Sequence, residues 1–285
     1  MKKIILLSLL FSTLIFANIN TVVSILPEKT FVEAIGGEKV NISVMVLPGN
    51  SPHTYEPKPS QMKKVAQADL YFAIGVEFEN IWLHKFKDLN KNMKMIDLST
   101  GIKKLPMAAD HHEQKPAIHS KEPKEDDPHI WTSPQNVKIM AEHIYEALVK
   151  ADPDNEGYYT QHYKTFLSLV EETDRKIKNI LSAKPKGTKF MVFHPSWGYF
   201  AKAYGLVQLP VEIEGKSPKP KELIELIKEA KKEHISAIFT QPEFSDAMAK
   251  VMANELHIKV IKVSPLAEDW SGNLIKIAQA IAGKE

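Results

Sequence analysis

The chain has 285 residues, with 37 basic and 35 acidic side chains and a formal net charge of +2. This balance carries no signature of a nucleic-acid partner. The absence of cysteine excludes disulfides, thiolate metal ligands and a lipid-bearing cysteine at the mature start. At roughly 150 residues per domain, the length predicts two lobes.

Residues 1–17 have the pattern of a secretory signal peptide. Two lysines form a basic start, an almost unbroken apolar run follows, and the small residue Ala17 stands at the predicted cleavage point. The apolar run is too short to cross a bilayer comfortably. We therefore expect the mature chain to begin near Asn18 and to be soluble outside the cytoplasm.

The first half of the mature chain alternates short apolar runs with amphipathic stretches. Strands are predicted at residues 21–25, 42–47, 70–74 and 93–96, and helices at residues 28–35, 60–68 and 79–86. A further helix is predicted to begin at Ser133-Pro134, a serine N-cap followed by proline at the first helical position. Strand and helix in alternation predict a parallel α/β lobe over residues 18–151.

The longest helical pattern follows and is predicted to connect the two lobes over residues 152–184. Its apolar side chains recur every three or four positions, with a polar interruption near Thr173. A helix of about 28 residues extends roughly 42 Å, which is enough to cross a small domain. Because a helical connector resists bending, we expect no large hinge motion between the lobes.

The α/β alternation then resumes over residues 185–285. Strands are predicted at residues 190–193, 207–211, 237–240 and 259–263, and helices at residues 220–232, 245–256 and 272–282. The fold class predicted for the whole chain is therefore α/β: two Rossmann-like lobes with parallel sheets, joined by one long rigid helix.

Three of the eleven histidines, His53, His129 and His194, lie directly beside a proline. Proline restricts the backbone, and each of these histidines falls in a loop after a predicted strand or before a helix, where open α/β sheets bind ligands. Three neutral imidazoles suit Zn²⁺, whereas Mn²⁺ favours more carboxylate oxygen. The alternative interpretation is ordinary packing, which we assign to the histidines within helical patterns: His84, His143, His162, His234 and His257.

Residues 103–128 form a separate histidine-rich segment with six acidic residues, five lysines and four prolines. Few of its side chains are apolar, so we expect a mobile loop. Its histidines, His111, His112 and His119, are candidates for accessory metal binding, because histidine-rich tracts favour metals. The alternative is a solvated insertion without a metal role.

Five segments together, residues 47–57, 127–131, 193–200, 238–245 and 264–267, resemble the periplasmic zinc-uptake receptors among the solute-binding proteins of ABC transporters. The resemblance implies two α/β lobes joined by a long helix, with Zn²⁺ bound between them as the transported ligand. It implies that His53, His129 and His194 are ligands, and that His194 favours zinc because manganese receptors carry glutamate there. It also implies a periplasmic receptor, expected to be a monomer, that delivers its metal to an inner-membrane ABC permease.

One position departs from that resemblance. Many such receptors carry an aspartate ligand where this chain has Ser264. The candidates for the fourth position are Ser264 itself, Glu268, Asp269, a histidine of the charged segment, or water.

Other functions stay open from the sequence. A manganese or other divalent-metal receptor of the same class is the first alternative. A secreted zinc hydrolase is the second, although there is no His-Glu-x-x-His helix and no carboxylate is clearly placed as a general base. A metal-storing adhesin is the third. We expect a receptor and not an enzyme.

Overall fold

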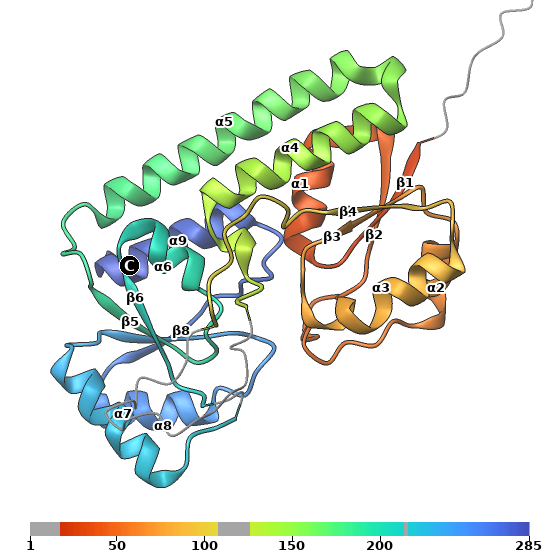
Figure 1. The fold of residues 1–285 in the computed structure, drawn as a ribbon. Coiled ribbons are helices and arrows are strands. Elements are labelled where there is room, and N and C mark those ends of the chain that lie inside the picture. Colours follow the sequence, from red (N-terminus) through yellow and green to blue (C-terminus); the bar gives the residue numbers. More distant parts are fainter. Residues whose placement is uncertain (1–17, 108–125, 214–215, 285) are drawn as a thin grey trace, which may run out of the picture.

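The computed structural model describes residues 18–107, 126–213 and 216–284, which fold into two α/β lobes (Figure 1). Each lobe contains one four-stranded parallel sheet. The predicted fold class is confirmed. Within the described ranges, no helix combines the length and the apolar character needed to span a membrane.

The N-terminal sheet has the strand order β2-β1-β3-β4. Its central strands are mostly buried because helices or loops cover both faces of a parallel sheet, and Val23 and Phe72 are fully buried. The elements of this lobe are β1 (Ile19–Val23), α1 (Leu26–Gly36), β2 (Val40–Val44), α2 (Pro59–Ala66), β3 (Leu70–Ala73), α3 (Glu77–Leu89) and β4 (Lys94–Asp97).

The C-terminal sheet repeats the same order as β6-β5-β7-β8. In such sheets the strand order reverses beside the first strand, and ligands bind outside the carboxyl ends of the strands at that point. The elements are β5 (Lys189–Val192), α6 (Gly198–Tyr204), β6 (Val207–Pro210), α7 (Pro220–Lys232), β7 (Ala237–Thr240), α8 (Ala247–Leu256), β8 (Lys259–Lys262) and α9 (Trp270–Ala282).

Two long helices, α4 (Pro134–Ala151) and α5 (Glu156–Leu181), run side by side along both lobes (Figure 1). The 26 residues of α5 extend about 39 Å, and the helix packs against α1 in one lobe and α9 in the other. Thr173 interrupts the apolar face of α5, and its buried hydroxyl lies 2.6 Å from the hydroxyl of Ser271 in α9. The long helix was thus predicted correctly, whereas the residue limits of the lobes stay a prediction.

The two lobes also contact each other directly. Trp131 donates its indole proton to the carbonyl of Pro265 (2.7 Å), and Trp270 donates to the carbonyl of Trp131 (2.8 Å). Across the same boundary, Thr30 donates to the carbonyl of Glu268 (2.7 Å). One continuous cluster of buried apolar residues includes side chains from both lobes. These hydrogen bonds and the shared apolar cluster hold the two lobes together, in agreement with a rigid connecting helix.

The structure also differs from the prediction in detail. The short helix α6 was not predicted, because its seven residues include no polar cap and it is stabilised by burying Tyr199 and Phe200. Ser133 does stand at the N-cap of α4, but its hydroxyl donates to the side chain of Gln135 instead of capping the helix. Most of the predicted mobile loop lies outside the described residues, and so do His111, His112 and His119.

Candidate metal centre

Three loops bring His53, His129 and His194 together between the lobes. His53 lies between β2 and α2, His129 lies directly before the 3-10 turn Ile130–Thr132 that leads into α4, and His194 follows β5. One candidate ligand atom from each imidazole lies within 4.8 Å of the other two. His129 and His194 are buried, and His53 is half-buried. The three histidines selected from the sequence therefore form one cluster.

The cavity that they share is small. Its volume is about 10 Å³, and Glu243 and Phe244 also line it. A volume of about 10–15 Å³ by this measure holds one water-sized sphere. The cavity therefore fits a single ion, and it has no room for an organic molecule.

Each imidazole has a carboxylate at its Nδ1 atom. The pairs are His53–Glu77 at 2.8 Å, His129–Asp127 at 2.8 Å and His194–Glu212 at 2.6 Å. A carboxylate accepts a hydrogen bond, so each Nδ1 carries the proton and each Nε2 keeps its lone pair. All three rings are thus held in the tautomer that presents Nε2 as a ligand.

The Nε2 atoms of His53 and His194 face each other at 3.1 Å. With both Nδ1 protons donated to carboxylates, neither Nε2 has a proton to share, so two lone pairs point at one another. A cation between them relieves that repulsion. Two ligands of a tetrahedral Zn²⁺ at about 2.0–2.1 Å are roughly 3.3 Å apart, which is close to the observed spacing.

Burial and neighbouring groups shift the pKa of one imidazole and one carboxylate at the site. Burial lowers the pKa of His194, and the neighbouring imidazoles add to this effect, against the opposing influence of Glu212. Burial by itself would raise the pKa of Glu77, but the hydrogen bond and charge of His53 outweigh it and the pKa is lowered. Near pH 7 the site therefore combines a neutral imidazole at His194 with an ionised carboxylate behind His53.

Aromatic side chains pack against two of the three rings. The ring of Phe244 stacks on His194 with centroids 4.8 Å apart, and Trp131 lies 5.3 Å from His129. The backbone N–H of His129 also donates to Asp127 (2.9 Å). Glycine is required at Gly198, because a Cβ atom there would lie 2.4 Å from a carboxylate oxygen of Asp127.

The three residues considered for the fourth position do not join this cluster. Ser264 donates to Glu243 (3.0 Å), and its oxygen accepts from the backbone of Leu266 (3.1 Å). Glu268 forms an ion pair with Lys29. Asp269 caps α9 by accepting from the backbone of Gly272 (3.0 Å). In the described part of the chain, the acidic and histidine side chains close enough to share one ion are the three histidines alone.

Sequence reasoning missed the roles of Glu77, Asp127 and Glu212. Asp127 belongs to a recognised motif, but nothing in the motif says that it faces a histidine ring. Glu77 opens α3 shortly after β3, and Glu212 follows β6 by two residues. A search for acidic residues just beyond the carboxyl ends of neighbouring strands would have found both.

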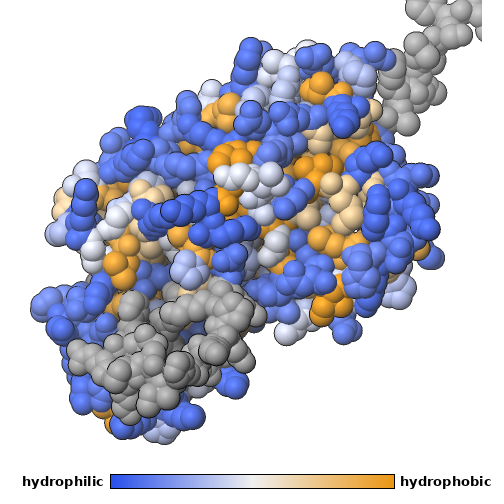
Figure 2. Space-filling model, in the orientation of Figure 1, coloured by the Kyte–Doolittle hydropathy of each residue, from blue (hydrophilic) through white to orange (hydrophobic). Residues whose placement is uncertain are grey.

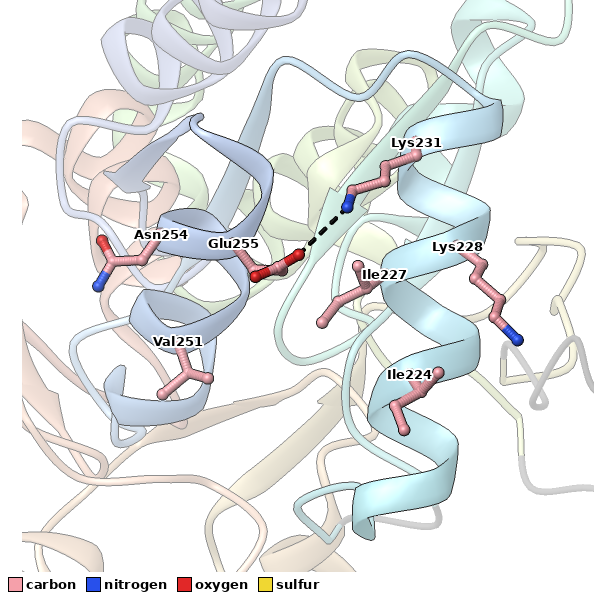
Figure 3. A pocket seen from close by; sticks show the side chains of 7 residues that line it. All are labelled: Ile224, Ile227, Lys228, Lys231, Val251, Asn254 and Glu255. Atoms are coloured by element: carbon pink, nitrogen blue, oxygen red, sulfur yellow. Dashed lines mark hydrogen bonds and ion pairs between the residues drawn. The ribbon is translucent and has the colours of Figure 1, made fainter.

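A much larger cavity lies elsewhere, on the outer side of the C-terminal lobe between α7 and α8 (Figure 3). Its volume is about 690 Å³, and it is lined by Ile224 and Ile227 from α7 and by Val251 from α8. An ion pair between Lys231 and Glu255 (3.2 Å) crosses it. None of the described residues that line it is a histidine, so we do not assign it a metal-binding role.

Comparisons with known proteins agree with the geometry. A family model described as zinc-uptake complex component A, periplasmic (ZnuA), matches residues 21–283. A crystal structure of ZnuA superimposes with a TM-score of 0.85 and 42% identity, covering 93% of this chain and 98% of that one.

Two further relatives are similar over most of the chain. A ZnuA deletion variant, which lacks residues 138–173 of its own sequence and was crystallised with zinc bound, gives a TM-score of 0.84 and 42% identity. The match covers 93% of this chain and 97% of that one. A putative metal-binding protein of Chlamydia trachomatis is 28% identical over 261 residues, which is 91% of this chain and 89% of that protein. The chain therefore belongs to the zinc-uptake complex component A family, the periplasmic substrate-binding proteins of metal ABC transporters.

Proposed function

We propose that this protein captures Zn²⁺ between His53, His129 and His194 and delivers it to the membrane permease of an ABC transporter. The observation that carries the proposal is the convergence of three Nε2 atoms, each on a ring whose Nδ1 is held by a carboxylate. Imidazole ligands oriented in this way bind zinc more tightly, because the outer carboxylate fixes the ring and raises its basicity.

Zinc is favoured over manganese by the chemistry of the donor set. Mn²⁺ prefers several oxygen ligands in octahedral geometry, whereas Zn²⁺ accepts three nitrogens in a tetrahedral site. At this site the carboxylates of Glu77 and Glu212 lie behind the rings, bonded to Nδ1. The small cavity also leaves little space for the extra waters of a six-coordinate ion.

The same features argue for binding over catalysis. A zinc hydrolase keeps an open metal position for water and needs room for its substrate. Here the cavity of about 10 Å³ admits no ester or peptide. We propose that purified zinc-loaded protein turns over no such substrate; measurable zinc-dependent hydrolysis would favour the enzyme alternative.

We further propose that residues 1–17 are removed on export and that the receptor acts in the periplasm as a monomer. One chain supplies all three histidines and all three carboxylates, so the site requires no second copy. The adhesin alternative is tested by deleting residues 108–126. A receptor retains one tight zinc site after the deletion, whereas a storage protein loses most of its zinc capacity.

The direct test is a competition titration of chelator-stripped protein with Zn²⁺ and with Mn²⁺, combined with thermal unfolding. Zinc should bind tightly with a stoichiometry of one at the central site and should raise Tm, because a ligand at 100 times its Kd stabilises the folded state by about 2.7 kcal/mol. Manganese should produce a much smaller shift. An unchanged melting curve at saturating zinc would rule out the receptor assignment.

A further inference from the structure

The coordination of zinc by three imidazoles leaves one tetrahedral position unassigned. Within the part of the chain that the structure describes, Glu243 is the single carboxylate among the side chains that line the three-histidine cavity. The carboxylates of Glu77, Asp127 and Glu212 are instead hydrogen-bonded to the Nδ1 atoms of the three imidazoles. Glu243 therefore differs from the other three carboxylates: it lines the cavity, whereas they lie behind the imidazole rings.

The loop that carries Glu243 is fixed to the loop that carries His194. Gln241 donates to the carbonyl of His194 (3.1 Å) and to the hydroxyl of Ser196 (2.6 Å). On the other side of Glu243, the Phe244 ring stacks on the His194 ring. Because Gln241 and Phe244, two residues before and one residue after Glu243, both contact the loop of the third histidine, the backbone of Glu243 is held beside the metal pocket.

The side chain of Glu243 is less constrained than its backbone. It is half-buried, and it accepts a hydrogen bond from Ser264 (3.0 Å). Ser264 itself is fixed, because its oxygen accepts from the backbone of Leu266 and its carbonyl accepts from Asn273 (2.7 Å). The serine hydroxyl thus gives the carboxylate a neutral hydrogen-bond partner.

Glu243 also connects two cavities. Besides the three-histidine pocket, it lines a neighbouring cavity of about 260 Å³ between the lobes, together with Ser264 and the loop around Pro48. An ion that enters from this larger cavity meets Glu243 before it reaches the imidazoles. A carboxylate at this boundary attracts a divalent cation and can follow it inward.

We propose that Glu243 is the fourth zinc ligand: it leaves Ser264 when the ion arrives and closes the coordination sphere of the three histidines. This inference rests on the proposed zinc-binding function. Ser264 is then not a ligand. Its hydroxyl holds the Glu243 carboxylate by a hydrogen bond while no zinc is bound. A closed four-ligand site has no metal-bound water to activate, which also accounts for a site that binds zinc without catalysis.

The test compares zinc affinity by chelator competition in the wild type, Glu243→Gln, Ser264→Ala and the matched control Glu268→Gln. Glutamine keeps the size of residue 243 but removes its charge, and we expect a loss of at least the roughly 10–100-fold that removal of an outer partner costs. Glu268→Gln should stay within about twofold of the wild type. Ser264→Ala should also bind zinc, because the ligand carboxylate is still present.

A second measurement reports on the coordination of the metal and not on its affinity. Co²⁺-loaded wild type should show a visible spectrum that is unchanged between pH 7 and pH 9, since no bound water is present to ionise, whereas Glu243→Gln should show a spectral titration from the water that replaces the carboxylate. Equal zinc affinity in wild type and Glu243→Gln, or a water titration in the wild type, would overturn the assignment of Glu243. Failure of the wild type to bind zinc would instead overturn the proposed function.

Discussion

Glu77 and Glu79 lie two residues apart in the first turn of α3, and they differ in both burial and partner: Glu77 is half-buried and faces His53, whereas Glu79 is almost fully buried. Burial acts to raise the pKa of both. At Glu77 the imidazole of His53 reverses the effect, and the pKa is lowered. At Glu79 burial prevails and raises the pKa to about 7, although Ser24 and two backbone N–H groups donate to it.

Acidic residues of the N-terminal lobe therefore have two different roles. Glu79 ties the end of β3 to Ser24 beside β1, and Tyr71 shares that serine (2.7 Å). Glu28, whose pKa is also raised by burial, accepts from the backbone of Ser24 (2.9 Å). These acids brace the strand ends that carry the site, whereas Glu77 acts on the site itself. Both acids accept hydrogen bonds that lower their pKa, and the outcome differs because Glu79 is almost fully buried whereas the half-buried Glu77 also pairs with the His53 imidazole.

The largest expected effect comes from removing a proposed ligand. His53→Ala should weaken zinc binding by about 100- to 1,000-fold, if the roughly 10–16 kcal/mol of a four-ligand zinc site is shared among its ligands. The variant also removes the partner of Glu77, so that this carboxylate becomes like Glu79. Chelator competition measures the effect, with the exposed His84→Ala on α3 as a control that should bind like the wild type.

The next effect separates the two glutamates directly. Glu77→Gln should reduce zinc affinity by roughly 10–100-fold, because glutamine keeps an acceptor oxygen but lacks the negative charge that raises the basicity of the His53 ring and favours its ligand tautomer. Glu79→Gln should change zinc affinity by less than about threefold, since no imidazole contacts residue 79. Similar losses in both variants would mean that general destabilisation of α3, and not orientation of His53, explains the result.

The pH dependence of apo stability gives a third, smaller effect. The folded-state pKa of Glu79 lies above its unfolded value near 4.5, so the folded protein binds the extra proton between these values. Its stabilising contribution is complete below about pH 4.5 and is lost as the pH rises towards 7, by at most about 1.4 kcal/mol per pH unit. Urea unfolding of chelator-treated protein should show this decline in the wild type, and the decline should be reduced in Glu79→Gln.

The smallest effect is expected for an acid that is exposed. Glu268 pairs with Lys29 across the lobe boundary, but its side chain is 56% exposed. Such pairs contribute at most about 1 kcal/mol, and less at high salt. Glu268→Gln should therefore shift the urea midpoint only slightly, and 0.5 M salt should erase the difference. A large shift would show that the lobes depend on this single contact more than on their shared apolar core.

Much of the fold was predictable because local patterns and tertiary packing agree. The buried runs at β3 and β7 and the helix α7 were located to within one residue, since continuous apolar stretches and a proline start are strong local signals. The helix α6 was missed because its formation depends on burying aromatic residues against other segments, a contact that a local pattern does not contain.

The residues of the site also fall into two groups: those that a local sequence pattern indicates and those that only tertiary contacts reveal. Proline-flanked histidines pointed to His53, His129 and His194, because a stiffened loop is visible in the chain itself. Their partners Glu77 and Glu212 come from other strands, and only the three-dimensional structure shows which carboxylate faces which ring. Glu243 was overlooked for the same reason, since its proximity to the cavity depends on how the Gln241 and Phe244 side chains contact the His194 loop.

The central claim is that zinc is held by three imidazoles in a small, closed site, and X-ray absorption at the zinc edge tests it most directly. Zinc-loaded protein should show four light-atom ligands at about 2.0–2.1 Å, with multiple scattering from three histidine rings that falls to two in His129→Ala. A six-coordinate spectrum dominated by oxygen, or an imidazole signal that does not change in His129→Ala, would contradict the account.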